Sequence, residues 1–451
     1  MQKPNRLSLR RQIRHFKNAF FQFGELPFKD LLPPDLINCI GASGDPREVV
    51  FSPLITLKAF LFQVLSATGS CKEAVSHILA ERLFSGLEAN SMSTGPYCKA
   101  RHRLLLPQLT QAVMAIGEKL HRHVPHAWTW KGFHVVIADG ATMLMPDTDE
   151  NQQAYPQQST QKPGLGFPIV RMVGLLSLAT GACLNYAVGP YQGKGSGESS
   201  LLSTLLDTFG GKDLLIADRY YCTYAIIALM LEKRVPVLFR LHANKTADFR
   251  LGKRLGVKDH WVQYKKPKRK PVWMSEQAFA DLPDTLTVRE FAVAGTVYVT
   301  TLLAAKTYPK KELAALYHQR WKIELDFRTI KTNMGMEMLR CKTPEMVRKE
   351  IAVNLLAYNL IRANLARAAI VCDKQPRHLS FMAAVQLMRN TASLCMQMTS
   401  KALEDLLAPL LNAIAYTVVG KYKRKNQPRV VKRRPKPFPL MNKPRDQYIT
   451  S

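Results

Sequence analysis

Two short apolar runs, each ending in an aspartate, constrain the fold of this chain most strongly. Residues 133–139 read Phe-His-Val-Val-Ile-Ala-Asp, and residues 213–218 read Asp-Leu-Leu-Ile-Ala-Asp. Continuously apolar runs of this length predict strands that are buried on both faces, as in the parallel part of an α/β sheet. Ligands of such sheets gather outside the carboxyl ends of the strands. Each strand is therefore expected to end at its aspartate and to deliver Asp139 and Asp218 to one sheet edge.

The segments that follow predict more strands and a β-rich insertion. A turn at Thr180-Gly181 joins two strand-like segments into a hairpin, and residues 235–242 predict another strand. From residue 244 to 296 the pattern changes, because the basic run 265–271 stands among short strand-like pieces. We therefore expect an α/β core over residues 131–343 that contains a β-rich insertion over 244–296.

Helical regions are expected on both sides of this core, over residues 1–130 and 344–418. In the first region, basic residues stand near the start of a helix predicted after a Gly-Pro turn, namely Lys99, Arg101, His102 and Arg103. Such a helix either enters a DNA groove or is a solvated basic helix, and the sequence leaves both readings open. Proline and dense positive charge over 419–451 predict a basic tail without a packed core.

The charge balance indicates a polyanionic partner. The 451 residues contain 64 Lys and Arg against 34 Asp and Glu, a net charge of +30. Nucleic acid is the first candidate for such a surplus. An anionic membrane surface is the second, but no apolar run reaches the length of a membrane span and no signal-peptide pattern is present. The eight cysteines are scattered without a close pair, which argues against a zinc cluster or a disulfide framework and indicates a reducing cytoplasm.

The stretch 316–331 predicts a helix with two functional faces. At 3.6 residues per turn, four polar residues fall within an arc of roughly 60°, namely Tyr317, Arg320, Glu324 and Lys331. Apolar residues occupy the neighbouring arc, and Trp321 is expected in the core. An ordinary amphipathic helix with an Arg320–Glu324 ion pair would explain this stretch alone. The two upstream aspartates favour a functional site over this ordinary helix, since they supply further acids for the same place.

Three acids from distant parts of the chain suggest a metal site. Asp139, Asp218 and Glu324 have like charges, so their convergence needs a lysine or a divalent cation as partner. Ligand sets of oxygen alone, without His or Cys, favour Mg²⁺ or Mn²⁺ over zinc. Two such ions support in-line phosphoryl displacement. The alternative is that each acid only caps a loop at the end of its strand.

Three motifs resemble the signatures of a known family. Asp139-Gly-Ala-Thr142, Asp218-Arg-Tyr-Tyr221 and Tyr317-x2-Arg320-x3-Glu324-x6-Lys331 are similar to those of bacterial insertion-sequence DDE transposases with a Tyr-Arg-Glu-Lys motif. The resemblance spans residues 132–370. It implies a ribonuclease-H-like catalytic core with a β-rich insertion and helical flanks. It also implies Mg²⁺-dependent cleavage at transposon ends and joining of the 3′-hydroxyl to target DNA. A catalytically silent or domesticated DNA-binding protein and a nuclease of the same fold are the alternatives.

The resemblance also assigns roles to individual residues. Asp139, Asp218 and Glu324 are implied as catalytic metal ligands. DNA contacts are implied or expected for Tyr317, Arg320, Lys331, Arg219 and Lys194. In relatives that form a DNA hairpin, an aromatic residue of the insertion stacks on a flipped base, and the candidates here are Trp261, Trp273 and Tyr298. The implied partners are double-stranded DNA, with its terminal inverted repeats, and a second copy of the chain. The expected location is the bacterial cytoplasm, at the nucleoid.

Overall fold

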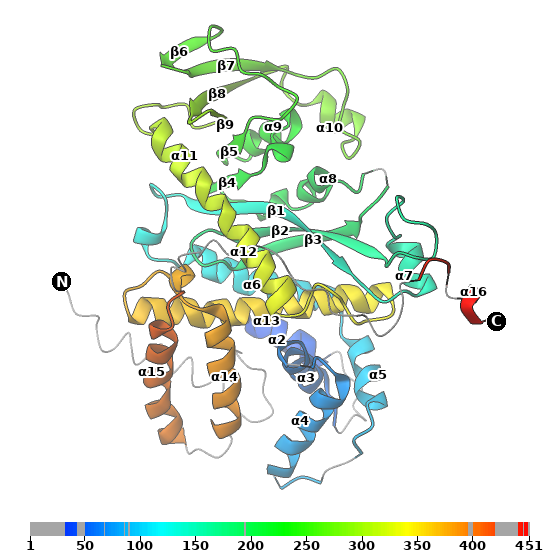
Figure 1. Ribbon diagram of the computed structural model, residues 1–451. Coiled ribbons are helices and arrows are strands. Elements are labelled where there is room, and N and C mark those ends of the chain that lie inside the picture. Colours follow the sequence, from blue (N-terminus) through cyan, green and yellow to red (C-terminus); the bar gives the residue numbers. More distant parts are fainter. Residues whose placement is uncertain are drawn as a thin grey trace, which may run out of the picture.

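The computed structural model describes residues 32–42, 50–66, 68–84, 86–88, 91–193, 195–395, 400–419, 441–444 and 446–449. These residues form a mixed α/β protein around one nine-stranded sheet, in the order β3-β2-β1-β4-β5-β9-β8-β7-β6 (Figure 1). The predicted mixed α/β class is confirmed. None of the described helices is both long and apolar enough to cross a membrane.

The first five strands form the half of the sheet that carries the predicted acids. They are β1 (His134–Leu144), β2 (Ile169–Ser177), β3 (Cys183–Pro190), β4 (Asp213–Ala217) and β5 (Val237–Arg240). β2 pairs antiparallel with both β1 and β3, so the predicted hairpin is present, whereas β4 pairs parallel with both β1 and β5.

The prediction that the first strand ends at Asp139 is wrong. β1 runs on to Leu144, and Asp139 faces Gly174 of β2 in mid-strand. The parallel ladder with β4 does end beside it, at the pair Ala138 and Ala217. β1 continues because its other neighbour, β2, is longer than β4 and still offers antiparallel hydrogen bonds. Asp139 therefore marks the end of the parallel ladder rather than the end of the strand.

The strands of the predicted insertion extend the same sheet. They are β6 (Lys253–Gly256), β7 (Asp259–Lys265), β8 (Thr285–Val293) and β9 (Thr296–Thr300), with the short helix α10 (Glu276–Ala280) between β7 and β8. β9 joins the two halves, because it pairs antiparallel with both β5 and β8. This half lies at the top of Figure 1, beyond β4 and β5.

Alternate residues of the central strands face two different cores. Val135 and Ile137 belong to a core with α6 (Leu106–Arg122) and the helices that follow β9. Val136 and Ala138 face the opposite core, which contains residues of α8 (Glu198–Ser203) and α9 (Tyr224–Glu232). This two-residue alternation is the usual consequence of the pleat. It determines which helix each later residue of β1 meets.

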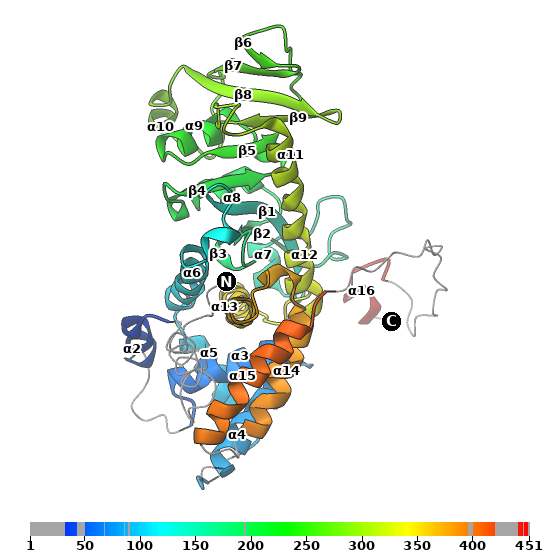
Figure 2. The same ribbon diagram turned by 90° about the vertical axis from the view of Figure 1, so that its left-hand side faces the viewer.

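The helical flanks meet at α13 (Pro344–Val371), a 28-residue helix of which most residues are buried. The helices around it are α2 (Pro34–Ala42), α3 (Pro53–Leu65), α4 (Cys71–Phe84), α5 (Gly95–Arg103), α14 (Phe381–Cys395) and α15 (Ser400–Tyr416). Figures 1 and 2 show α3, α4, α14 and α15 on the side of α13 that is away from the sheet. The domain boundaries at residues 130, 343 and 418 remain predictions.

The basic helix of the first region differs from its prediction. α5 begins at Gly95 and ends at Arg103, so Arg101, His102 and Arg103 lie in its last turn rather than at its start. Arg101 is also buried, with its guanidinium over the rings of Phe60 and Tyr97. The Gly-Pro pair starts the helix directly instead of forming a separate turn before it. The predicted basic tail lies outside the described residues except for 441–444 and α16 (Asp446–Ile449).

The stretch 316–331 is not a single regular helix. α11 (Lys310–His318) passes through a 3₁₀ turn at Gln319–Trp321 into α12 (Lys322–Arg328) and then into a π-helical turn at Thr329–Asn333. A 3₁₀ turn has three residues per turn, which shifts the phase of the side chains behind it. The expectation of a buried Trp321 is accordingly wrong, because this side chain is 59% exposed.

A buried cluster of charges fixes α12 in place. Asp326 pairs through one carboxylate oxygen with Arg362 of α13, at 2.6 Å, and through the other with Arg377, at 2.8 Å. Arg362 also donates to the Tyr358 hydroxyl, which in turn donates to the Gly181 carbonyl between β2 and β3. The helix that carries Glu324 is thus attached to α13 and to the sheet.

We predict that Asp326→Ala lowers the free energy of unfolding by about 3–5 kcal/mol, because it leaves two buried arginines without a carboxylate. Urea denaturation followed by circular dichroism measures this change. Asp248→Ala serves as a control, since Asp248 pairs with the exposed Arg250, and its effect should be far smaller. Equal effects of the two substitutions would contradict the structural role of Asp326.

Candidate active site

Two of the three predicted acids pair with one guanidinium, and the charge of the third acts on it. Arg320 donates from Nη1 to Asp139 Oδ2 at 2.9 Å and from Nη2 to Glu324 Oε1 at 3.0 Å. Asp218 directly follows β4, and its charge acts on Asp139, Arg320 and Tyr317. Elements from three distant parts of the sequence therefore contribute to one site, at the end of the parallel ladder between β1 and β4.

The pleat of β1 explains why these side chains meet. Asp139 has the same parity as Val135 and Ile137, so it stands on the face covered by α12, which carries Glu324. Asp218 keeps an extended backbone, with φ −69° and ψ 168°, and so continues the alternation of β4. Gly140, of the opposite parity, faces α8 instead. The site thus occupies one face of the sheet and borders the other through Gly140.

The environment of Asp139 disfavours its charged form. Burial raises the pKa of Asp139 from 3.8 to about 6. The Gly140 N–H, which donates to Asp139 Oδ1 at 2.9 Å, and the Arg320 charge both oppose this rise, whereas Glu198 and Asp218 add to it. A carboxylate in such surroundings gains from an added cation more than an exposed one does.

The oxygen ligands of the three acids fit a divalent cation, although the three side chains are not arranged around one metal position. All three offer oxygen ligands, which suit Mg²⁺ and Mn²⁺. Within the described residues, no three His, Cys, Asp or Glu side chains are placed to hold a metal ion together. Arg320 lies between Asp139 and Glu324 and supplies the positive charge there. Metal binding by both acids therefore requires the Arg320 side chain to move.

Two other residues of the polar arc predicted for the 316–331 helix, Tyr317 and Lys331, have features that suit ligand contact. Tyr317 is 6% exposed, and its hydroxyl, near the Arg240 backbone, makes no hydrogen bond within the described chain. A buried hydroxyl without a partner is costly, so it is a donor available to a ligand oxygen. Lys331 is half-buried in the π-helical turn, and no described carboxylate forms an ion pair with it. Both features suit contact with phosphate oxygens.

The remaining predicted DNA contacts are placed in different ways. Arg219 is half-buried and lies over the exposed ring of Tyr220. Tyr298 is 2% exposed and packs against the rings of Phe291 and Tyr317, so it presents no face to a base. Lys194 lies outside the described residues.

The two tryptophans of the insertion are also distinct. Trp261 is half-buried and donates from Nε1 to the Leu303 carbonyl at 2.9 Å, under the Lys253 ammonium group. Trp273 instead lines an open cavity of about 480 Å³ at the start of α8, on the face of the sheet opposite to α12. Arg171, Glu198 and Tyr220 line the same cavity.

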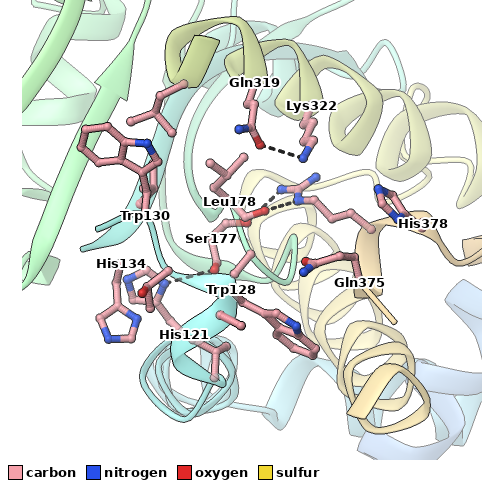
Figure 3. A pocket seen from close by; sticks show the side chains of 17 residues that line it. His121, Trp128, Trp130, His134, Ser177, Leu178, Gln319, Lys322, Gln375 and His378 are labelled. Carbon is pink, nitrogen blue, oxygen red and sulfur yellow. Dashed lines mark hydrogen bonds between the residues drawn. The ribbon is translucent and has the colours of Figure 1, made fainter. Parts of the chain in front are cut away.

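A second cavity, of about 300 Å³, lies at the amino ends of β1 and β4 and is drawn in Figure 3. Near it, His121 bonds to Ser177 Oγ through Nδ1 at 3.1 Å and to Asp213 through Nε2 at 3.0 Å. This order reverses the ring atoms of a hydrolase triad, and Ser177 is 1% exposed. Arg122 also pairs with Asp213. These contacts attach α6 to the sheet, so the group is structural.

Comparison with known proteins identifies the family. Residues 130–360, about half of the chain, match the family model described as the transposase DDE domain. The chain belongs to this family. Over 428 residues it is 27% identical to the transposase InsG for insertion sequence element IS4 of Escherichia coli (strain K12), covering 92% of this chain and 93% of the relative.

Shorter matches agree with this family. A 68-residue match is 40% identical to the transposase for insertion sequence element IS421 of Escherichia coli, covering 15% of this chain and 18% of the relative. A 105-residue match is 25% identical to the putative transposase InsZ, covering 23% of this chain and 34% of the relative. The expectation of a bacterial insertion-sequence DDE transposase is confirmed. A role in transposition, and DNA as the partner, follow from this membership.

We predict that Asp139→Asn stabilises the protein in EDTA at pH 7.5 by up to about 3 kcal/mol. The folded Asp139 holds its proton up to about pH 6, whereas the unfolded chain releases it near pH 3.8. Stability of the wild type therefore falls as the pH rises through this window, and below pH 4 the variant's advantage should vanish.

Melting temperatures from pH 3.5 to 7.5 test this, with the exposed Asp147→Asn as control. Added Mg²⁺ should raise the melting temperature of the wild type more than that of Asp139→Asn. A stability difference that does not change with pH would contradict the burial argument.

Proposed function

We propose that this transposase binds the ends of its insertion sequence, cleaves the DNA there and joins the freed 3′-hydroxyl ends to target DNA. The observation that carries the proposal is the convergence of Asp139 and Glu324 on Arg320, with Asp218 beside them. Acids that lie 185 residues apart in the sequence, on a strand and on a helix, are brought to one basic side chain. In a chain of net charge +30, this arrangement suits phosphate chemistry on DNA.

The sheet order supports a finer proposal for the fold. An antiparallel β3-β2-β1 unit followed by parallel β4 and β5 fits a ribonuclease-H-like core over residues 131–343. The strands β6 to β9 then represent the β-rich insertion over 244–296, with β9 running on to Thr300. We assign end recognition to residues 1–130, and we propose that two copies of the chain act together on DNA.

In this proposal the three acids hold the metal ions, and Arg320, Tyr317 and Lys331 bind the DNA. Asp139, Asp218 and Glu324 would hold Mg²⁺, with Mn²⁺ as a substitute, when Arg320 turns from them to the DNA. Bound divalent ions supply the charge that stabilises the attacking and leaving oxygens of an in-line displacement. Arg320 and Lys331 donate to phosphate oxygens of the terminal strand. The buried Tyr317 hydroxyl donates to an oxygen of the same strand and so fixes its position.

Trp273 is the aromatic residue that we assign to a displaced base. Its cavity adjoins Glu198 and Tyr220, close to Asp218, and its volume of about 480 Å³ accommodates a nucleobase. The exposed Val272 and Tyr220 provide further apolar surface at this cavity. Stacking of a flipped base on such surfaces is worth about 1–3 kcal/mol. Trp261 and Tyr298 are left out of the assignment because their side chains are engaged elsewhere.

We predict that Asp139→Ala, Asp218→Ala and Glu324→Ala each reduce DNA cleavage in Mg²⁺ by about a thousandfold or more, because each removes a metal ligand. Binding of duplexes that carry the terminal repeats should persist in EDTA. Cleavage assays on radiolabelled ends and gel-shift assays measure the two properties. Asp147→Ala, at an exposed position in the segment after β1, is the control. Normal cleavage by any of the three variants would exclude that acid from the catalytic site.

We also predict that Trp273→Ala suppresses the fluorescence increase that 2-aminopurine, placed next to the cleaved bond, shows when it leaves the base stack of the duplex. Without the Trp273 ring, the displaced base has less surface to hold it outside the duplex. The affinity of the variant for the same duplex should change by less than about tenfold. Tyr416→Ala, at an exposed aromatic residue on α15, is the control. An unchanged fluorescence signal in Trp273→Ala would show that the cavity does not take the base.

A further inference from the structure

A fourth carboxylate, Glu198, approaches the candidate active site from the opposite face of the sheet. It is the first residue of α8, the short helix beside β1 and β4 in Figure 1. Glu198 Oε2 accepts a hydrogen bond from the Tyr221 hydroxyl at 3.0 Å. Tyr221 is fully buried and belongs to the short turn that begins after Asp218. The next residue, Ser199, donates to the Tyr220 carbonyl at 3.4 Å, so α8 is attached to this turn twice.

The same carboxylate rests against β1. A Cβ atom built on Gly140 would lie 2.3 Å from Glu198 Oε1, so a side chain at residue 140 would displace the glutamate. Gly140 is the immediate neighbour of Asp139. One side chain therefore contacts both the strand that carries Asp139 and the turn that follows Asp218.

This contact places Glu198 near other acids, and the repulsion between like charges costs free energy. We therefore expect Glu198 to have a role that offsets this cost. The Glu198 charge acts on Asp139, and among the acids around it this effect is larger than that of Asp218. A charged acceptor also holds a hydroxyl more firmly than a neutral amide does. A firm bond matters here, because Asp218 lies just beyond the end of β4 and has no strand partner of its own.

We propose that Glu198 is a positioning residue that holds the Asp218 turn against β1 through Tyr221 and so fixes the separation of the two aspartates. The inference rests on the proposed function, in which both aspartates hold the same divalent ions. Glu198 acts through Tyr221 and Gly140, and it is not itself a ligand.

The test is direct Mn²⁺ binding to the full-length protein without DNA, measured by electron paramagnetic resonance. The variants are Tyr221→Phe, Glu198→Ala, Glu198→Gln and the double variant Glu198→Ala/Tyr221→Phe. Tyr221→Phe and Glu198→Ala should each weaken binding by about five- to twentyfold, the value of one lost hydrogen bond. The double variant should be no worse than either, because both remove the same contact. Glu198→Gln should have a smaller effect, since its amide oxygen still accepts from Tyr221. The Mg²⁺ concentration for half-maximal cleavage should shift in the same order.

Tyr264→Phe is the matched control. The Tyr264 hydroxyl donates to Glu290 at 2.5 Å, a buried tyrosine–glutamate bond in the β7–β8 region. Its loss should lower the melting temperature without changing Mn²⁺ binding, which separates loss of folding stability from loss of positioning.

Two results would overturn the inference. If Tyr221→Phe binds Mn²⁺ like the wild type while Glu198→Gln is as weak as Glu198→Ala, Glu198 acts through its charge and not as a clamp. If all Glu198 and Tyr221 variants bind like the wild type, the contact has no role in metal binding. Asp139→Ala tests the proposed function separately, because unchanged Mn²⁺ binding in that variant would remove the metal site whatever Glu198 does.

Discussion

The pairing of Asp326 with Arg362 and Arg377 is the interaction on which the site geometry depends. All three side chains are almost completely buried, and a buried charge is tolerated only with a close partner. α12 can therefore dock only where both arginines reach Asp326. Glu324 precedes Asp326 by two residues, or about 200° around a helix, so it points away from α13 and toward the sheet. The buried ion pairs thereby aim an acid at Asp139.

Charge balance organises the site itself. The charges of Asp218 and Glu198 act on Asp139, and the Arg320 guanidinium pairs with Asp139 and Glu324. This local excess of negative charge lies within a strongly basic chain. The excess favours cations at the acids, while the cations of the surrounding chain favour DNA. Arg320 belongs to both groups, because its donors suit a carboxylate and a phosphate equally well.

Several predictions made from the sequence succeeded because they depend on local pattern. The apolar runs before Asp139 and Asp218 are strands, and the Thr180-Gly181 turn does join a hairpin. Others failed because neighbours decide them. β1 passes Asp139 since β2 is available to pair with it, and Trp321 is exposed since a 3₁₀ turn alters the helical phase. Arg101, expected either in a DNA groove or on a solvated helix face, is buried against aromatic rings.

Glu198 shows the same limit most clearly. In the sequence it is one acid after a Gly-rich loop, with no spacing that relates it to Asp139 or Asp218. Its role becomes visible only where the pleat of β1 turns Gly140 toward α8 and leaves room for a carboxylate. A glycine at position 140 is consistent with this contact, but the sequence alone does not relate it to Glu198.

The sequence by itself determined the chemical inventory of this protein. Residue types and their spacing specify two aspartates that follow apolar strand segments, a helical glutamate with flanking cations, and a net charge that favours a polyanionic partner. Tertiary structure decided how these parts face one another. Register, helix phase and buried ion pairs arise from contacts between residues far apart in the chain, and local sequence pattern has no information about such distances.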